Sequence, residues 1–409
     1  MLIRTLEQDT LSHQVLKDVY EDKSLSEKDL AFIKRLYSGT LEKLTALDYI
    51  LDQFSSLPVR KMKPVIRNIL RMSLYQMQYM GSVPVYTSID EAVKLTRKRG
   101  LRQLTGFVNG ILRNADRKAS QLELPDHIKA CAPKWIYDLL IRQYGKKAAD
   151  DFFQAVQNAS SETCIRICGP ADPILESLMQ DGCSIRECLP ESGAYAISGF
   201  RRLGSLKAFQ EGNIIIQDPS SILAAQAALI DDPSPAMVID VCAAPGGKSL
   251  YIAQKSPGSR IIARDLTPQK ADKIRENIDR LHVSNMEVQV FDARKDDPAL
   301  HEQADVVVAD LPCSGLGVIA GKPDILHRLR QEDLTSLSAL QKQILGTVQA
   351  YVKKGGILIY STCTVNRGEN QDNTRWFLKH HPFQLLQEQQ FLPGKDPFDG
   401  FYIARFKKQ

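Results

Sequence analysis

Hydrophobic residues recur every three or four positions along the first part of the chain, and this spacing predicts helices. The clearest run covers residues 29–54. Residues 65–79 repeat the period behind Pro64, at a position where a helix tolerates proline. A further helix is expected to open at Thr87 or Ser88, and the last one covers 107–112. The pattern predicts a compact all-α domain over residues 1–125.

After residue 125 the pattern changes to short segments separated by glycine and proline. Two helices are expected over 135–144 and 148–157, followed by short strands over 163–167, 194–197 and 214–217. This mixture is typical of a small α+β module, which we place at 126–205 as a connector. Its pattern assigns it no chemistry.

From residue 206 to 409, strands and helices alternate. Strands are expected over 238–241, 260–263, 286–290, 306–309 and 357–360, with helices from 248, over 268–281 and over 333–352. Such alternation predicts a mostly parallel, doubly wound sheet with helices on both faces. Residues 400–406 are expected to add one late edge strand.

The loop after the first of these strands consists largely of small residues. It comprises Asp240, Val241, Cys242, Ala243, Ala244, Pro245, Gly246, Gly247 and Lys248. A phosphate loop would need glycine where Cys242 stands, and the dinucleotide fingerprint G-x-G-x-x-G is absent. Two interpretations remain for the loop alone: the looser loop of S-adenosylmethionine methyltransferases, and an ordinary strand–turn–helix.

Polar residues follow the later strands as well. Asp265, Asp292 and Asp310 come after the second, third and fourth strands, and residues 361–364 (Ser-Thr-Cys-Thr) come after the fifth. A single Asp at a strand end is more often a helix cap than a ligand. Four polar endings at one edge favour a ligand site, because open sheets bind ligands outside the carboxyl ends of their strands. We expect Asp265 to accept hydrogen bonds from ribose hydroxyls and Asp292 to meet an adenine amino group.

Composition limits the classes of protein to consider. The chain has 409 residues, 43% hydrophobic and 25% charged, which is typical of a soluble globular protein with two or three domains. Neither a signal peptide nor a membrane span is evident, so we expect a cytoplasmic protein with no membrane partner. The net charge of +5 is mild, so a nucleic-acid surface has to be a local patch.

One such patch is a basic cluster near the end of the helical domain. The basic cluster consists of Lys94, Arg97, Lys98, Arg99 and Arg102. By charge alone such a run is usually a solvated helix face, but its density beside Gly100 also suits contact with phosphates.

The eight cysteines are expected to stay reduced in a cytosolic chain. Cys164, Cys168, Cys183 and Cys188 invite comparison with a zinc site, but no histidine lies among them and their spacings are unusual, so we expect no metal. Cys313 and Cys363 differ, because each follows a strand that ends at the expected ligand site. A thiolate there can add to carbon 6 of a pyrimidine and so make carbon 5 nucleophilic enough to accept a methyl group.

Sequence motifs carry two resemblances to known families. Residues 27–41 (EKDLAFIKRLYSGTL), 69–77 (ILRMSLYQM) and 107–113 (FVNGILR) resemble the NusB-like RNA-binding domain. The 240–248 loop, residues 310–318 (DLPCSGLGV) with 322–325 (KPDI), and residues 361–370 (STCTVNRGEN) resemble the RNA cytosine-5 methyltransferases. The whole chain thus resembles the bacterial 16S ribosomal RNA methyltransferase B family, of the Sun/Fmu type.

The resemblance implies a fold of three parts. They are an all-α NusB-like domain, the small α+β connector, and an α/β Rossmann-like class I methyltransferase domain that uses S-adenosyl-L-methionine. It implies methyl transfer to carbon 5 of a cytosine in 16S rRNA, free or in a partial small-subunit particle, by a monomeric enzyme. The target base is expected to leave its stack.

The resemblance also implies roles for particular residues. Cys363 is the nucleophile and Cys313 assists release of the product. The donor is expected to contact the loop residues Cys242 to Lys248 together with Asp265, Asp292 and Asp310. Asp310 and Lys248 are both expected to contact the cytosine, and which of them contacts which group is left open. Cys242 is not expected to react. One departure is Arg264, where the family tends to a small or apolar residue.

Two rival functions remain at this point. The first is an RNA-binding protein whose methyltransferase fold is inactive, against which the intact Cys313 and Cys363 speak. The second is a methyltransferase acting on tRNA, since such relatives share the catalytic domain. The NusB-like front favours rRNA.

Overall fold

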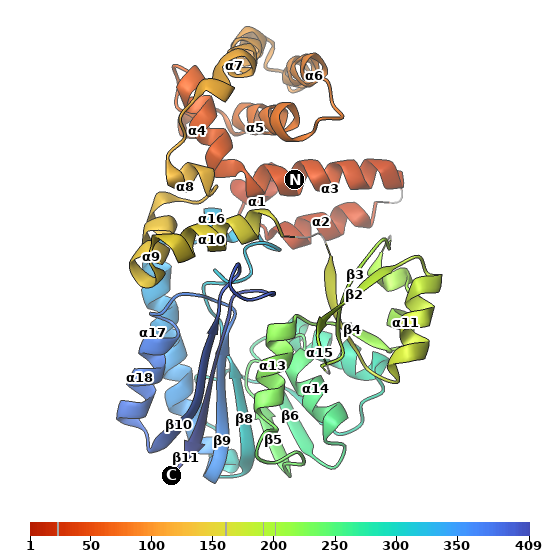
Figure 1. The fold of residues 1–409 in the computed structure, drawn as a ribbon, viewed down its shortest axis with the longest axis vertical. Coiled ribbons are helices and arrows are strands. Elements are labelled where there is room, and N and C mark those ends of the chain that lie inside the picture. Colours follow the sequence, from red (N-terminus) through yellow and green to blue (C-terminus); the bar gives the residue numbers. More distant parts are fainter. Residues whose placement is uncertain (23, 160–161, 191, 201) are drawn as a thin grey trace. The chain divides into compact units, whose positions relative to one another are not determined.

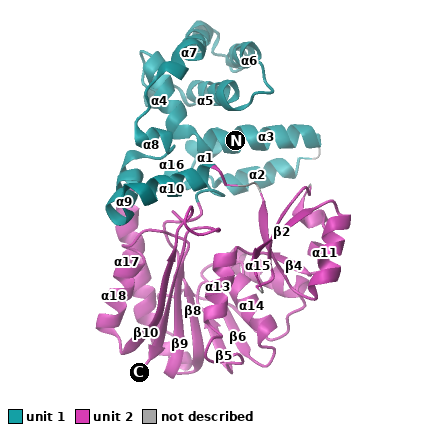
Figure 2. Ribbon diagram, in the orientation of Figure 1, with its two compact units in different colours: residues 1–157, 319–329 teal, residues 158–318, 330–409 magenta. Residues whose placement is uncertain are grey.

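The computed structural model describes residues 1–22, 24–159, 162–190, 192–200 and 202–409. The chain forms two compact units (Figure 2). Unit 1 contains Met1–Gln157 together with Ile319–Leu329, and unit 2 contains Asn158–Val318 and Arg330–Gln409. We call the second segment of unit 1, residues 319–329, the strap. Division into three domains with boundaries after 125 and 205 stays a prediction, because compactness groups 126–157 with the front helices.

Unit 1 is built from helices, which Figure 1 shows in red to yellow, except the helix of the strap, which is light blue. They are α1 (Leu2–Leu6), α2 (Ser12–Tyr20), α3 (Glu27–Glu42), α4 (Leu44–Phe54), α5 (Pro64–Tyr79), α6 (Val85–Lys98), α7 (Thr105–Lys118), α8 (Asp126–Lys129), α9 (Lys134–Tyr144), α10 (Lys146–Gln157) and α16 (Ile325–Arg328) in the strap. The main core packs the apolar faces of α4 to α7 together, around Leu51, Leu70, Leu74 and Leu112.

Several helix boundaries differ from the predictions: α7 extends beyond 107–112 at both ends, and the helix predicted over 333–352 covers Gln331–Val348. The run over 29–54 is two helices, α3 and α4, which meet at Lys43. The helix α6 begins at Val85 rather than at Thr87 or Ser88, since Pro84 stands at its N-cap and pre-sets the backbone there. The prediction that the hydroxyl of Thr87 or Ser88 marks the start of this helix was therefore wrong, because both residues lie inside it.

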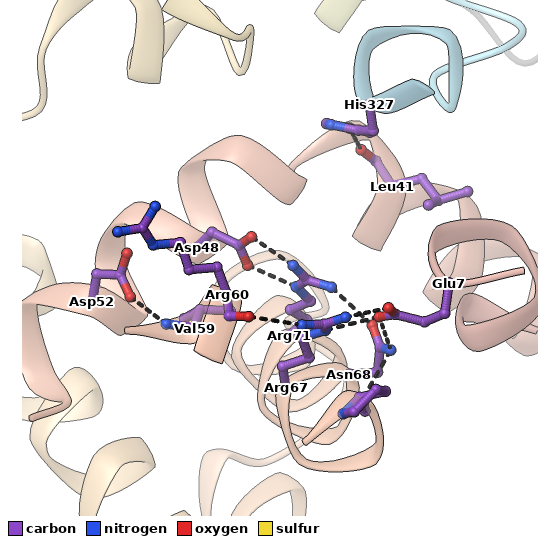
Figure 3. Close-up of polar contacts among 11 residues, drawn as sticks. Glu7, Leu41, Asp48, Asp52, Val59, Arg60, Arg67, Asn68, Arg71 and His327 are labelled. Atoms are coloured by element: carbon purple, nitrogen blue, oxygen red, sulfur yellow. Dashed lines mark hydrogen bonds and ion pairs between the residues drawn. The ribbon is translucent and has the colours of Figure 1, made fainter. Parts of the chain in front are cut away.

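Three polar contacts hold the strap in unit 1. The Ser12 hydroxyl donates to Asp324 at 2.5 Å, and the guanidinium of Arg328 pairs with Asp9 at 2.7 Å. The imidazole Nε2 of His327 lies 2.8 Å from the carbonyl oxygen of Leu41 (Figure 3). Asp324 is almost fully buried. These contacts make the strap part of the helical unit although it comes from the C-terminal half of the chain.

Unit 2 opens with a small antiparallel sheet in the order β2-β3-β1-β4. Its elements are β1 (Thr163–Ile167), α11 (Ala171–Gln180), β2 (Ser184–Leu189), β3 (Ala194–Ser198), α12 (Lys207–Gln210) and β4 (Ile214–Ile216). The helix α11 and the strand β2 were not predicted. β4 pairs with β1, so residues beyond 205 complete this module.

The rest of unit 2 is a seven-stranded sheet in the order β10-β11-β9-β8-β5-β6-β7. Its strands are β5 (Met237–Asp240), β6 (Arg260–Asp265), β7 (Met286–Val290), β8 (Ala304–Asp310), β9 (Val352–Thr362), β10 (Phe383–Phe391) and β11 (Phe401–Lys408). Its helices are α13 (Pro219–Ala227), α14 (Gly247–Lys255), α15 (Pro268–Arg280), α17 (Gln331–Val348) and α18 (Gln371–His380). The strands β5 to β9 pair in parallel, as predicted.

Helices cover both faces of the sheet, and alternate residues of its strands face them. Ile239 of β5 packs in one core with Leu345 of α17 and Phe377 of α18. Its neighbour Val238 packs in the other core with Ile252 of α14. Figure 1 shows α17 and α18 on one side and α13 and α14 on the other. The alternation predicted from the sequence is confirmed.

The prediction of one late edge strand was wrong. The strand β11 lies inside the sheet, antiparallel to β9 on one side and to β10 on the other. β10, which was not predicted, forms the edge. All residues from Phe401 to Phe406 are buried, because both faces of this strand are covered.

Candidate active site

The carboxyl ends of β5 and β8 meet at the point where the order of strands reverses. From β5 the chain continues to β6 and β7 on one side, while β8 and β9 follow on the other. Ligands of open α/β sheets bind in the crevice at such a switch point. The predicted polar endings therefore gather at the edge of the sheet where a ligand is expected.

The loop after β5 turns sharply into α14. Gly246 precedes the helix with φ of +104°, a conformation that L side chains rarely adopt. Its N–H donates to the carbonyl of Ala243 at 2.6 Å. The Ser249 hydroxyl donates to the buried Asp240 at 2.5 Å, and burial raises the pKa of that carboxyl to about 7. The backbone of residues 241–247 is thus fixed at the strand end.

Asp265 closes β6 beside this loop. Its Oδ2 accepts the N–H of Ala244 at 3.0 Å, and its Oδ1 accepts the N–H of Leu266 at 2.7 Å. The ammonium of Lys270 lies 3.1 Å from Oδ1. An ionised carboxylate offers about four acceptor sites, so one remains open on Oδ2. Asp265 therefore fits a hydroxyl donor such as a ribose.

Asp292, after β7, is engaged by its own turn. Both oxygens accept from the guanidinium of Arg294, the closest contact being 2.7 Å. This hydrogen bonding lowers the pKa of Asp292 to about 2. The carboxylate is ionised and lies at the expected edge of the sheet, but an adenine amino group would compete with Arg294 for it.

An ion pair at the strand ends joins Lys248 to Asp310. The ammonium lies 2.6 Å from Oδ2 of Asp310 and 2.9 Å from the hydroxyl of Ser221, on α13. The other oxygen of Asp310 accepts the hydroxyl of Ser361 at 2.8 Å. Lys248 is only 8% exposed. A buried pair of this kind presents one fixed positive and one fixed negative group at the crevice.

Cys313 and Cys363 come together although they lie far apart in the sequence. Asp310 of β8 is paired with Ser361 of β9; Cys313 follows β8 by three residues, and Cys363 comes directly after β9. The two sulfur atoms lie 3.3 Å apart. The contact with Cys363 and then burial raise the pKa of the Cys313 thiol well above its usual value. Cys313 therefore keeps its proton, and its sulfur lies within hydrogen-bonding distance of the Cys363 sulfur.

Cys242 and Arg264 occupy interior positions near the loop. Burial, followed by the nearby acidic groups, raises the pKa of Cys242, so this thiol stays protonated. Arg264 pairs with Asp297 at 2.5 Å and lies over the ring of Phe291, 4.2 Å from its centroid. The residue that departs from the family pattern thus has local partners, and it leaves Asp265 in place.

Sequence reasoning did not single out three residues that touch this site. They are Ser221, which holds Lys248, and Gln341 and Glu369, which hold the two cysteine loops. Glu369 lies inside the motif 361–370, so its position was visible in the sequence. Its partner Ser314 lies 55 positions away, which no local pattern reveals.

All five residues of the basic cluster are exposed in unit 1, at the end of α6 and just beyond it. Lys94 pairs with Asp90 at 2.7 Å and Glu91 at 2.9 Å, which raises its pKa. The exposed charges of Arg97, Lys98, Arg99 and Arg102 leave a patch that is accessible to an anionic partner.

A cavity of about 360 Å³ also lies in unit 1, lined by residues that include Trp135 and His327. Its two arginines are already paired, Arg67 with Glu7 and Arg71 with Asp48 (Figure 3). None of the predicted site residues lines it. Within the described residues, no group of three His, Cys, Asp or Glu side chains could hold a metal ion, and no helix is long and apolar enough to cross a membrane.

Two family models match the chain. One, described as 16S rRNA methyltransferase RsmB/F, matches residues 228–407, and one described as the NusB family matches residues 1–117. The probable ribosomal RNA small subunit methyltransferase B of Bacillus subtilis (strain 168) is 34% identical, covering 100% of this chain and 97% of the relative. The ribosomal RNA small subunit methyltransferase B of Yersinia enterocolitica is 29% identical, covering 95% and 92%.

Solved structures share the fold. The crystal structure of PH0851 has a TM-score of 0.81 and 23% identity, covering 97% of this chain and 93% of that one. NSun6 from Pyrococcus horikoshii with SFG has a TM-score of 0.61 and 21% identity, covering 68% and 98%. Together with the family matches, these likenesses confirm the predicted fold class: a NusB-like helical front and a Rossmann-like methyltransferase sheet.

Proposed function

The chain belongs to the ribosomal RNA small subunit methyltransferase B family, and on this premise we propose that it methylates carbon 5 of a cytosine in 16S rRNA. Methylation of rRNA follows from the family; the choice of carbon 5 rests on the site. The observation that carries the choice is the pair of cysteines, whose sulfur atoms lie 3.3 Å apart beside the Lys248–Asp310 pair. Methylation of an exocyclic nitrogen or a ribose hydroxyl has no use for two such thiols.

S-Adenosyl-L-methionine fits as the methyl donor. The Gly246–Gly247 backbone, the open acceptor site of Asp265 and the charge of Asp292 would hold it, together with residues 242–248. When bound, it supplies an electrophilic methyl group. Gly247 leaves little free space for a side chain, because a Cβ there would lie 3.3 Å from the Gln217 side chain.

The reaction we propose uses both thiols. The Cys363 thiolate adds to carbon 6 of the cytosine, which makes carbon 5 nucleophilic. After carbon 5 has been methylated, a base takes its proton, the carbon–sulfur bond breaks and Cys363 leaves as a thiolate beside the protonated Cys313, which assists its release. Lys248 and Asp310 are placed to hydrogen-bond the edge of the base, with the ammonium stabilising negative charge that develops on it.

The RNA partner is proposed to contact the basic cluster. Its exposed arginines, within the residues that match the NusB family, suit phosphate oxygens and would give register rather than sequence specificity. The target base has to leave its stack to reach Cys363. Action by a monomer in the cytoplasm, on free rRNA or on a partial particle, stays a prediction.

The test compares wild type with separate Cys363→Ala and Cys313→Ala variants, using 16S rRNA and labelled S-adenosylmethionine. Methyl transfer and denaturant-stable protein–RNA adduct are scored together. We expect Cys363→Ala to be inactive and free of adduct, and Cys313→Ala to accumulate adduct because release is blocked. Methylation of cytosine carbon 5 by Cys363→Ala would refute the nucleophile assignment.

A parallel assay with tRNA in place of 16S rRNA distinguishes the two substrate classes. Labelling of tRNA but not of 16S rRNA by the wild type would overturn the proposed substrate and leave the chemistry intact. If the wild type labels neither RNA, the protein binds RNA without methylating it.

A further inference from the structure

A buried carboxylate connects the loops that carry the two cysteines. Glu369 is fully buried, on the turn that follows Cys363 and leads into α18. Its Oε2 accepts the backbone N–H of Ser314 at 2.9 Å, and its Oε1 accepts the Ser314 hydroxyl at 2.6 Å. Ser314 directly follows Cys313. The Glu369 side chain thus binds the Cys313 loop through one backbone donor and one side-chain donor.

Two further amides complete the surroundings of Glu369. Asn366, on the Cys363 loop, donates to Oε1 at 3.1 Å, and Gln341 of α17 donates to Oε2 at 3.1 Å. Gln341 also donates to the carbonyl of Pro312 at 2.8 Å, on the other side of Cys313. The loop around Cys313 is therefore fastened both before and after the cysteine, and Glu369 takes part in both attachments.

All four of these donors are uncharged, so they satisfy the carboxylate by hydrogen bonds alone. A buried carboxylate with four donors is well solvated by the protein, whereas a neutral amide in its place offers only one oxygen acceptor. The charge of Glu369 also acts on Cys313, where it helps to keep the thiol protonated.

We propose that Glu369 is a positioning residue that holds Cys313 against Cys363 and thereby sets the rate at which the methylated product is released. The proposal rests on the proposed function, since it concerns the thiol assigned to release. It assigns Glu369 no contact with RNA or donor. Its role is to fix the place and protonation of Cys313, while addition of Cys363 to the base does not depend on it.

The main variant is Glu369→Gln, which has nearly the same shape. Its amide presents two N–H donors toward groups that are themselves donors, so the Cys313 loop loses part of its attachment. We expect adduct with 16S rRNA to accumulate at least 10-fold above wild type, kcat to fall at least 10-fold, and KM for the RNA to change less than threefold. The same adduct is expected in Cys313→Ala, but not in Cys363→Ala.

Ser314→Ala is a milder second variant, because it keeps the backbone N–H and removes only the hydroxyl, which lies 2.6 Å from Oε1 of Glu369 and 2.7 Å from the Thr364 hydroxyl. We expect it to fold and to accumulate less adduct than Glu369→Gln but more than wild type. The matched control is Thr374→Val, which removes a fully buried hydrogen bond of 2.6 Å to Tyr402 without touching either cysteine loop. It is expected to lower the melting temperature and to leave the adduct at the wild-type level.

The outcomes separate this inference from the proposed function. If Cys313→Ala traps adduct but folded Glu369→Gln and Ser314→Ala do not, Glu369 does not position Cys313 and the inference falls while the function stands. Adduct in Thr374→Val equal to that in Ser314→Ala would also overturn it, since general loosening would then be the cause. If Cys313→Ala itself traps no adduct, the assigned role of Cys313 fails first.

Discussion

At Asp265, two backbone N–H groups and an ammonium occupy most of the acceptor sites of one carboxylate. The position was predicted from its place after the second strand of the sheet, and the structure adds the reason that the carboxylate stays fixed. Arg264 beside it faces away, toward Asp297 and Phe291. The unusual arginine and the expected aspartate therefore serve different sides of β6.

A substitution at Asp265 should weaken binding of the donor. In Asp265→Asn, the charged acceptor becomes a neutral amide, and a hydrogen bond to a charged group contributes about 1.5–3 kcal/mol. We expect the Kd for S-adenosylmethionine to rise about 10- to 100-fold, measured by calorimetry. Asp272→Asn, which alters an exposed pair with Arg275 at 2.8 Å on α15, is the control and should bind as wild type does. Equal affinities in all three proteins would refute the assignment.

Among the elements, the strap has the most unusual placement. It leaves unit 2 after Val318, close behind the loop of Cys313, and returns at Arg330. Its short helix α16 carries His327, whose imidazole is buried against the carbonyl of Leu41 (Figure 3). Nothing in the local pattern of residues 319–329 distinguishes them from a surface loop.

The buried His327 should make the helical unit sensitive to acid. Burial lowers its pKa below the usual value of 6.5, so the folded protein binds this proton less readily than the unfolded chain. The contribution of His327 to stability is complete above that value and is lost as the pH falls through the lowered pKa. When the pH is lowered from 8 to 5, the melting temperature of His327→Gln should fall by less than that of wild type.

The glutamine in that variant can still donate to Leu41. His301→Gln changes a half-exposed histidine paired with Asp296 at 2.8 Å, and it should lose as much stability in acid as wild type. An acid response of His327→Gln identical to that of wild type would show that His327 does not carry the effect.

On the scale of the whole molecule, unit 1 is completed by residues that come late in the chain. The NusB match ends at residue 117, but the compact unit also includes 126–157 and the strap. Ile319 and Leu326 of the strap are almost fully buried. The compact front unit thus includes a segment from the C-terminal half of the chain.

A fragment of residues 1–157 should therefore be less stable with its strap missing. It lacks the hydrogen bonds that join the Ser12 hydroxyl and the Leu41 carbonyl to the strap, each of which contributes about 0.5–1.5 kcal/mol. We expect a synthetic 319–329 peptide to raise the melting temperature of the fragment, measured by circular dichroism. The same peptide with Asp324→Ala and His327→Ala should have little effect; an equal effect would mean that the polar contacts do not hold the strap.

Local patterns in the sequence determined the order of most elements, though not α11, β2 and β10, and the chemistry available at each strand end. The period of apolar residues encodes helices and strands, and small residues after β5 encode a close approach to a ligand, because both depend on near neighbours. On that basis Cys313, Cys363, Lys248 and the aspartates could be named as candidates before any fold was known. Even the buried run of β11 was visible, though not its place in the sheet.

Tertiary structure decided which of these residues meet. Pairing of β8 with β9 sets the two sulfur atoms 3.3 Å apart, and insertion of β11 beside β9 makes an interior strand of the expected edge. The contacts of Glu369 with Ser314 and of Asp324 with Ser12 join segments that share no local pattern. Such contacts depend on how distant segments pack, and the spacing of residues along one segment carries no record of its partner.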